Sequence, residues 1–241
     1  MRRIQLLLWV CMLAGAGCSL QDGTLDPDTV LTLNAGPETV LADGQKRITL
    51  TATLGELADP NLSVIFRTDG GRFAGTARQA AQEITVPASQ GQATVELISN
   101  TAVLDKVVVS AEIQGLTDQS ISFKAFDSVR FARAFPEEML LEADRLSVPA
   151  DQFQAASLTV SLFRTDGGQV SDGSLIRFSA TPVDTSEAVA LLPDFIFADQ
   201  TTATISVKSQ TFSAGQVFIK AETETEDGSL LEKTIILTFT E

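Results

Sequence analysis

Residues 47–54 read Arg-Ile-Thr-Leu-Thr-Ala-Thr-Leu, so that polar and apolar side chains alternate along the whole stretch. Successive side chains of a β-strand point to opposite faces, and this alternation is therefore typical of a strand with one buried face. Rows of the same kind occupy residues 92–97, 107–113 and 121–125. Clusters of Gly, Asn, Asp and Pro lie between the rows, as turns require. The pattern predicts an all-β sandwich of two antiparallel sheets.

The whole pattern occurs a second time further along the chain. Leu158 repeats Leu50, and the spacing of about 110 residues between the copies is the size of one immunoglobulin-like sandwich. The pentapeptide Arg-Thr-Asp-Gly-Gly also occurs twice, at 67–71 and at 164–168. The first copy follows the third strand of the first unit, whereas the second copy precedes the third strand of the second unit. We therefore interpret this identity as a coincidence in turn-forming sequence.

The repeat predicts two tandem immunoglobulin-like domains, at residues 30–126 and 138–241. We assign residues 127–137 to a short linker between them. Pro136 restricts the conformation of its neighbour and so stiffens this connection. The two domains are expected to form a semi-rigid rod.

The N-terminus has the features of a bacterial lipoprotein signal peptide. Two arginines precede an uncharged, mostly apolar run that is too short to span a bilayer. The run ends in Leu-Ala-Gly-Ala-Gly-Cys and resembles a lipobox, although Gly15 stands where that pattern usually has Leu. We predict a signal peptide at 1–17, lipidation of Cys18, and a flexible acidic tether at 18–29. The alternative is ordinary signal cleavage near this point, which would leave a free thiol.

Several stretches resemble the bacterial immunoglobulin-like domains of invasin- and intimin-type surface proteins. The second domain departs from the family pattern because it lacks the glycine of the Gly-x-Ala-x-Val-x-Leu strand. The resemblance implies the fold, whereas proteins with this fold have many functions. The matching stretches are Ala42-Asp43-Gly44, residues 64–66 with the glycine turn at 70–73, residues 90–97, the long loop at 166–178, and the penultimate strand at 214–221.

The inventory of side chains argues against an enzyme. The chain has no His and no Tyr, and its only Trp and one of its two Cys lie in the predicted signal peptide. The usual proton shuttle, thiol nucleophile and His/Cys zinc site are therefore missing, and we expect no cofactor. Acidic residues at 222–227 could in principle serve glycoside hydrolysis, but their alternation with Thr predicts a solvated hairpin. The net charge of −14 disfavours nucleic acid as a partner and leaves the acyl chains to hold the protein at a membrane.

Two sets of residues are candidates for binding. Phe195 and Phe197 lie in an apolar stretch that could be an exposed patch for a partner protein or an edge strand folded onto the core, and we prefer the core interpretation. Asp166, Asp172 and Asp227 lie in predicted loops and could bind calcium through their oxygens, although no ligand pattern is complete.

These features predict a lipid-anchored structural or adhesive protein that acts as a spacer or as a protein-binding module. Ser19 resembles the residue that directs lipoproteins to the outer membrane, where the protein could face the cell surface or the periplasm. One alternative is a periplasm-facing accessory subunit of an envelope complex. The other is a module that binds calcium or another ligand.

Overall fold

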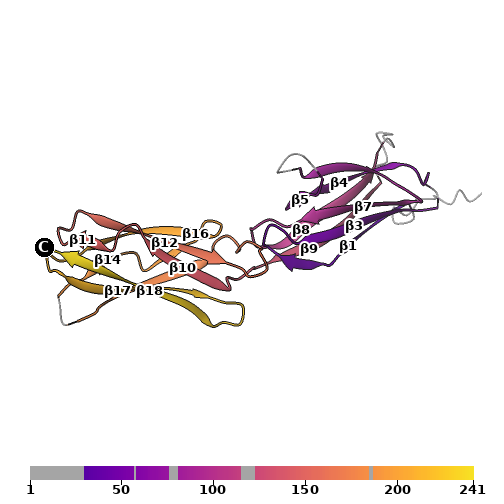
Figure 1. Ribbon diagram of the computed structural model, residues 1–241. Helices are drawn as coiled ribbons and strands as arrows, with labels where there is room; N and C mark the ends of the chain where they lie inside the picture. The colour runs from indigo at the N-terminus through magenta and orange to yellow at the C-terminus, as the bar shows by residue number, and fades with distance from the viewer. Residues whose placement is uncertain (1–29, 57, 76–80, 115–122, 185–186) are drawn as a thin grey trace, which may run out of the picture.

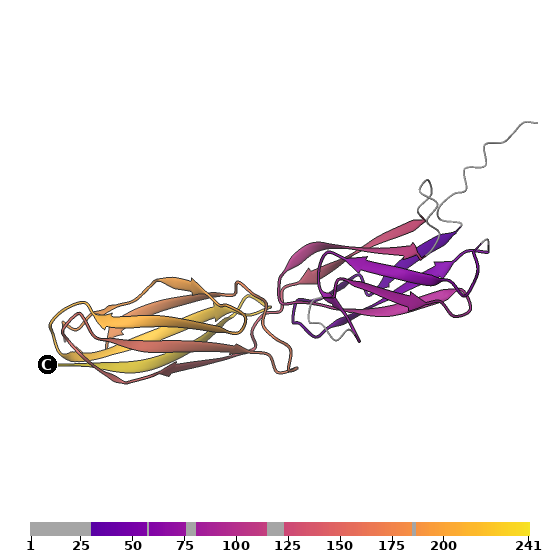
Figure 2. The same ribbon diagram turned by 90° about the horizontal axis from the view of Figure 1, so that it is seen from above.

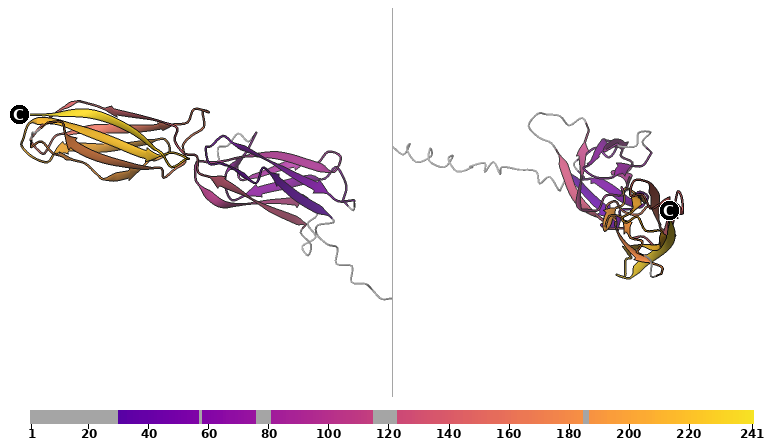
Figure 3. Two further views of the ribbon diagram at one scale, coloured as in Figure 1. Left: turned by 90° about the horizontal axis from the view of Figure 1, so that it is seen from below. Right: turned by 90° about the vertical axis from the view of Figure 1, so that its left-hand side faces the viewer.

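The computed structural model describes residues 30–56, 58–75, 81–114, 123–184 and 187–241. They form two β-sandwiches that follow one another along one long axis (Figure 1). Seen from above and from below, the long strands of both sandwiches run roughly along this axis (Figures 2 and 3). The predicted signal peptide and Cys18 with its tether lie outside the described residues. Within the described residues, no helix has the length and hydropathy needed to cross a membrane.

The first sandwich consists of a four-stranded and a five-stranded sheet, which confirms the all-β prediction. The four-stranded sheet has the order β1 (Leu31–Gly36), β3 (Arg47–Leu54), β7 (Gln92–Ile98) and β5 (Arg72–Phe73). The five-stranded sheet has the order β2 (Thr39–Leu41), β9 (Lys124–Ala132), β8 (Leu104–Ile113), β4 (Ser63–Thr68) and β6 (Glu83–Pro87).

The second sandwich repeats this topology strand for strand, as the sequence repeat predicts. Its four-stranded sheet has the order β10 (Glu138–Ala143), β12 (Ala155–Phe163), β16 (Thr202–Ser209) and β14 (Ala190–Leu191). Its five-stranded sheet has the order β11 (Ser147–Pro149), β18 (Leu230–Thr240), β17 (Gly215–Glu224), β13 (Leu175–Pro182) and β15 (Phe195–Phe197).

Each sandwich encloses a hydrophobic core of its own. In β3, Ile48, Leu50 and Ala52 are fully buried between the two sheets, while the intervening threonines face outward. One core cluster contains residues only up to Phe131, and the other begins at Met139. The alternation read from the sequence therefore corresponds to two separate cores.

Two details differ from the predicted arrangement. One edge pair in each five-stranded sheet is parallel, β2 with β9 and β11 with β18, because the first strand of each unit leaves one sheet and continues in the other. In addition, β9 runs through the start of the predicted linker 127–137, since Val129 and Phe131 are buried in the first core. Only residues 133–137 connect β9 to β10.

The acidic segment 222–227 forms a hairpin, as its alternation with Thr predicts. β17 and β18 pair antiparallel, and Glu224 lies opposite Leu230 at the open end of the turn. Asp227 closes the turn, because its Oδ1 accepts hydrogen bonds from the Thr225 hydroxyl and from the Ser229 amide at 3.0 Å. These bonds stabilise the carboxylate and lower the pKa of Asp227 to about 2. The carboxylate is thus part of the turn structure.

Candidate functional site

The loop 164–174, between β12 and β13, reaches out of the second sandwich and contacts the end of the first. The Gln169 amide donates a hydrogen bond to the Asp43 carbonyl at 3.0 Å. The Asp172 amide donates to the Thr101 carbonyl at 2.9 Å, and the Thr101 hydroxyl donates to Asp172 Oδ2 at 2.8 Å. The two sandwiches are therefore joined by direct hydrogen bonds as well as by the covalent linker. We call this contact the interdomain joint.

Ser171 lies at the centre of the interdomain joint and is fully buried. Its hydroxyl donates to the Ala42 carbonyl at 2.8 Å and accepts from the Ala134 amide at 2.8 Å. Its own amide donates to the Ala134 carbonyl at 3.0 Å. One side chain thus satisfies buried backbone groups of the first sandwich and of the linker at the same time, which buried polar groups require.

Asp43 and Gly168 meet at a very short distance in the same joint. Asp43 is fully buried, and its Oδ1 accepts hydrogen bonds from the amides of Gln45 and Lys46 at 2.9 and 2.8 Å. A Cβ atom at position 168 would lie 2.8 Å from Asp43 Oδ2 and 3.1 Å from Asp43 Cβ. Only glycine allows the loop to approach the first sandwich this closely.

A charged network surrounds the exposed side of the joint. Lys46 of the first sandwich lies 3.2 Å from Asp166 Oδ2 and 4.0 Å from Asp43 Oδ2. Arg164 is almost fully buried; it donates to the Phe135 carbonyl at 2.9 Å and lies 3.2 Å from both Glu137 and Asp166. The bonds from Arg164, the Gly168 amide and Lys46 hold the pKa of Asp166 far below its ordinary value.

The depressed pKa of Asp166 predicts that acid weakens the structure around the joint. The ionised carboxylate is favoured in the folded protein, so its stabilisation is fully present above the ordinary Asp pKa of about 4. It is lost progressively as the pH falls from there through the depressed pKa of the folded protein. We expect Asp166→Asn to lower the free energy of unfolding most at neutral pH and progressively less as the pH falls below about 4. Urea unfolding of both proteins across this range measures the difference. A difference independent of pH would contradict the assignment.

The three aspartates considered for calcium do not come together. Asp166 and Asp172 lie on the loop of the interdomain joint, whereas Asp227 lies in the β17–β18 turn. Their oxygens bind Lys46 and Arg164, Thr101, and the turn residues described above. Among the described residues, no group of three or more His, Cys, Asp or Glu side chains is placed to hold a metal ion.

Phe195 and Phe197 lie on β15, the edge strand of the five-stranded sheet of the second sandwich. The preferred interpretation, that both rings fold onto the core, is wrong: 56% of Phe195 and 58% of Phe197 are exposed. The intervening Ile196 packs against the core instead. The two rings contact each other edge to face, with centroids 5.9 Å apart and planes at 73°. The register of β15 therefore places both phenylalanine side chains on the outer face of the sheet.

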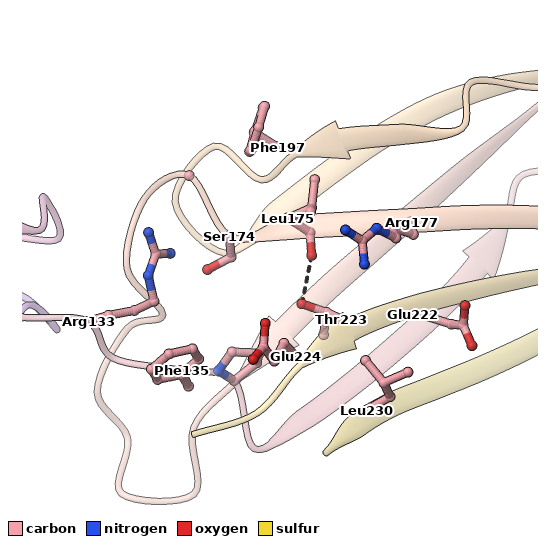
Figure 4. A pocket seen from close by; sticks show the side chains of 12 residues that line it. Arg133, Phe135, Ser174, Leu175, Arg177, Phe197, Glu222, Thr223, Glu224 and Leu230 are labelled. Carbon is pink, nitrogen blue, oxygen red and sulfur yellow. Dashed lines mark hydrogen bonds between the residues drawn. The ribbon is translucent and has the colours of Figure 1, made fainter. Parts of the chain in front are cut away.

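A hollow of about 290 Å³ lies beside Phe197, between the linker and the outer face of the same sheet (Figure 4). Arg133 and Phe135 enter it from the linker, and Arg177 enters it from β13. The Thr223 hydroxyl closes its floor by donating to the Leu175 carbonyl at 2.9 Å. The remaining lining residues are Pro136, Gly173, Ser174, Glu222, Glu224 and Leu230.

Sequence reasoning missed the interdomain joint, although it separated the two Arg-Thr-Asp-Gly-Gly copies correctly. The first copy begins in the last two residues of β4 and continues beyond it, whereas the second copy precedes β13, the strand equivalent to β4. Gly71 of the first copy has a φ of 74°, and a Cβ there would lie 2.5 Å from the Ile98 carbonyl oxygen. Gly168 of the second copy faces Asp43. The two glycines thus allow two different close contacts. The signal in the sequence that pointed to the interdomain joint was a charged, glycine-rich loop beside a short linker.

Comparison with solved structures finds similar folds in a bacterial adhesin and in a bacterial integrin-binding protein. InvE, an adhesin of Yersinia pseudotuberculosis, is 20% identical over 92% of this chain and 61% of its own, with a TM-score of 0.54. Invasin, described as a bacterial integrin-binding protein, is 18% identical over 88% of this chain and 39% of its own, with a TM-score of 0.61. The chain thus spans less than two thirds of either protein. No protein-family model and no curated sequence matches it. These likenesses confirm the tandem bacterial immunoglobulin-like fold.

Proposed function

We propose that the protein is a lipid-anchored structural and adhesive module of the bacterial envelope, which holds a protein-binding surface away from the membrane. The interdomain joint carries this proposal. Relative motion of tandem domains is the usual expectation when few contacts cross between them. Here the buried Ser171 and the loop around it tie the second sandwich to the first. A molecule with this joint suits a spacer, because its far end keeps a defined distance from its anchor.

The anchor itself is part of the proposal. The lipobox-like sequence before Cys18 supports acylation, and two or more acyl chains give stable attachment where one is marginal. The N-terminal end of the first sandwich then faces the membrane, and the second sandwich lies at the distal end (Figure 1). The adhesin and the integrin-binding protein with the same fold support an adhesive role. The absence of His from the sequence argues against an enzyme.

Protease treatment of intact cells tests location and anchoring together. We expect the wild-type protein to be shaved from whole cells while a periplasmic marker survives, and Cys18→Ala to move the protein out of the membrane fraction. Protection until the outer membrane is opened would exclude adhesion and favour the accessory subunit that faces the periplasm. Membrane association that survives Cys18→Ala would contradict the lipid anchor.

A further inference from the structure

The outer edge of β15 offers backbone groups for pairing. β15 is antiparallel to β13, with Ile196 opposite Ile176, and the Ala198 and Phe178 amides bond across to Ser174 and Asp194. Hydrogen bonds alternate along an antiparallel pair, so the N–H and C=O of Ile196 point toward β13. Those of Phe195 and Phe197 point away from the sheet, and within the described residues no strand pairs with that side.

The equivalent edge of the first sandwich is protected against such pairing. β6 occupies the same place beside β4 that β15 occupies beside β13. By the same alternation, Glu83, Thr85 and Pro87 are the residues whose backbone groups face outward. Proline and charged side chains on an edge strand prevent its pairing with another chain. β15 has neither, and its outward positions carry two exposed phenylalanines instead.

The hollow beside Phe197 is lined by two arginines and two glutamates. Glu222 lies 2.5 Å from Lys220, which also lies 3.4 Å from Glu232. Arg133 and Arg177 make no ion pair in the part of the chain that the structure describes, so their guanidinium groups are available to a ligand. Guanidinium groups favour carboxylates as partners.

We propose that β15 binds an extended segment of a partner protein as an added strand, with an acidic side chain of that segment in the hollow. Backbone bonds to Phe195 and Phe197 supply affinity, as in other cases of strand addition. The exposed rings pack on apolar side chains of the segment, and Arg133 and Arg177 select its carboxylate. The inference rests on the proposed protein-binding function, but its test uses purified protein and does not depend on which face of the membrane the protein occupies.

A phage-displayed library of random linear peptides, selected on the exported chain carrying Cys18→Ala, tests the proposal. We expect the enriched peptides to combine an acidic residue with alternating apolar residues. Phe197→Pro removes an N–H that points away from the sheet and leaves the bonds to β13 in place. We expect this variant to bind synthetic copies of the enriched peptides about tenfold or more weakly than the wild type. Thr85→Pro is the matched control on the protected edge and should leave binding unchanged. Phe197→Thr keeps the N–H and separates the loss of the ring from the loss of the bond.

Hydrogen exchange gives a second readout that does not need the proline variant to fold. On binding of an enriched peptide, exchange should slow at the Phe195 and Phe197 amides and stay unchanged at Ile196, which is already bonded within the sheet. Arg177→Glu should remove the preference for acidic peptides. The proposal is overturned if no peptide is enriched, if the enriched peptides lack acidic residues, or if binding protects neither phenylalanine amide.

Discussion

In the variant Phe66→Ala, the first sandwich is expected to lose about 3–5 kcal/mol of unfolding free energy while the second keeps its stability. Phe66 is fully buried on β4, opposite Ala111 of β8 and Ile84 of β6. Removing its ring leaves a cavity that two hydrogen-bonded sheets cannot close. Phe178 occupies the equivalent place on β13, and Phe178→Ala should destabilise the second sandwich in the same way, slightly less because its ring is not fully buried.

Calorimetry and hydrogen exchange are the measurements, because residues 30–241 contain neither Trp nor Tyr as a fluorescent probe. Each variant should lower one of two unfolding transitions and leave the other in place, since the two cores share no residues. Phe153→Ala is the control: the side chain is 83% exposed, and its loss should change stability by less than about 0.5 kcal/mol. A single transition that moves as a whole would contradict two independently folding sandwiches.

The strands could be predicted because their signal is local. In 47–54 the alternation places every apolar residue on one face, and that face is buried in the structure. β15 carried no such signal, because Phe-Ile-Phe is apolar at every position and a shift of one residue exchanges the buried and exposed faces. Its register is decided by Ile196 lying opposite Ile176, a contact that the sequence of the strand does not encode.

The linker was misjudged for a related reason. Asp127 and Ser128 look like turn residues, yet both belong to β9, where Ser128 is exposed and Asp127 is partly buried. Asp127 Oδ2 accepts a hydrogen bond from the Ala35 amide at 2.8 Å, so it ties β9 to β1. The partners in the interdomain joint are also far apart in the sequence: Ser171 bonds to Ala42, 129 positions earlier. Such contacts depend on tertiary structure, and a local sequence pattern does not predict them.

Ser171→Ala is expected to release the interdomain joint without unfolding either sandwich. The substitution leaves the Ala134 amide without its acceptor and the Ala42 carbonyl without its donor, both in a buried place. Each orphaned group costs about 1–3 kcal/mol, so the closed joint should lose about 2–6 kcal/mol relative to an open one that water can enter. Residual dipolar couplings measure the result: one alignment tensor should fit both sandwiches of the wild type, and two different tensors should be needed for the variant.

Ser174→Ala is the matched control for this experiment. Ser174 is also buried in the loop 164–174, but its hydroxyl donates at 2.9 Å to the Ser171 carbonyl and makes no bond across the joint. The control should therefore keep a single tensor, although it loses one buried hydrogen bond. If Ser171→Ala also keeps a single tensor, the surrounding bonds of Gln169 and Asp172 suffice to hold the sandwiches. If the wild type already needs two tensors, the joint is open in solution, and a spacer of defined length is no longer a tenable function.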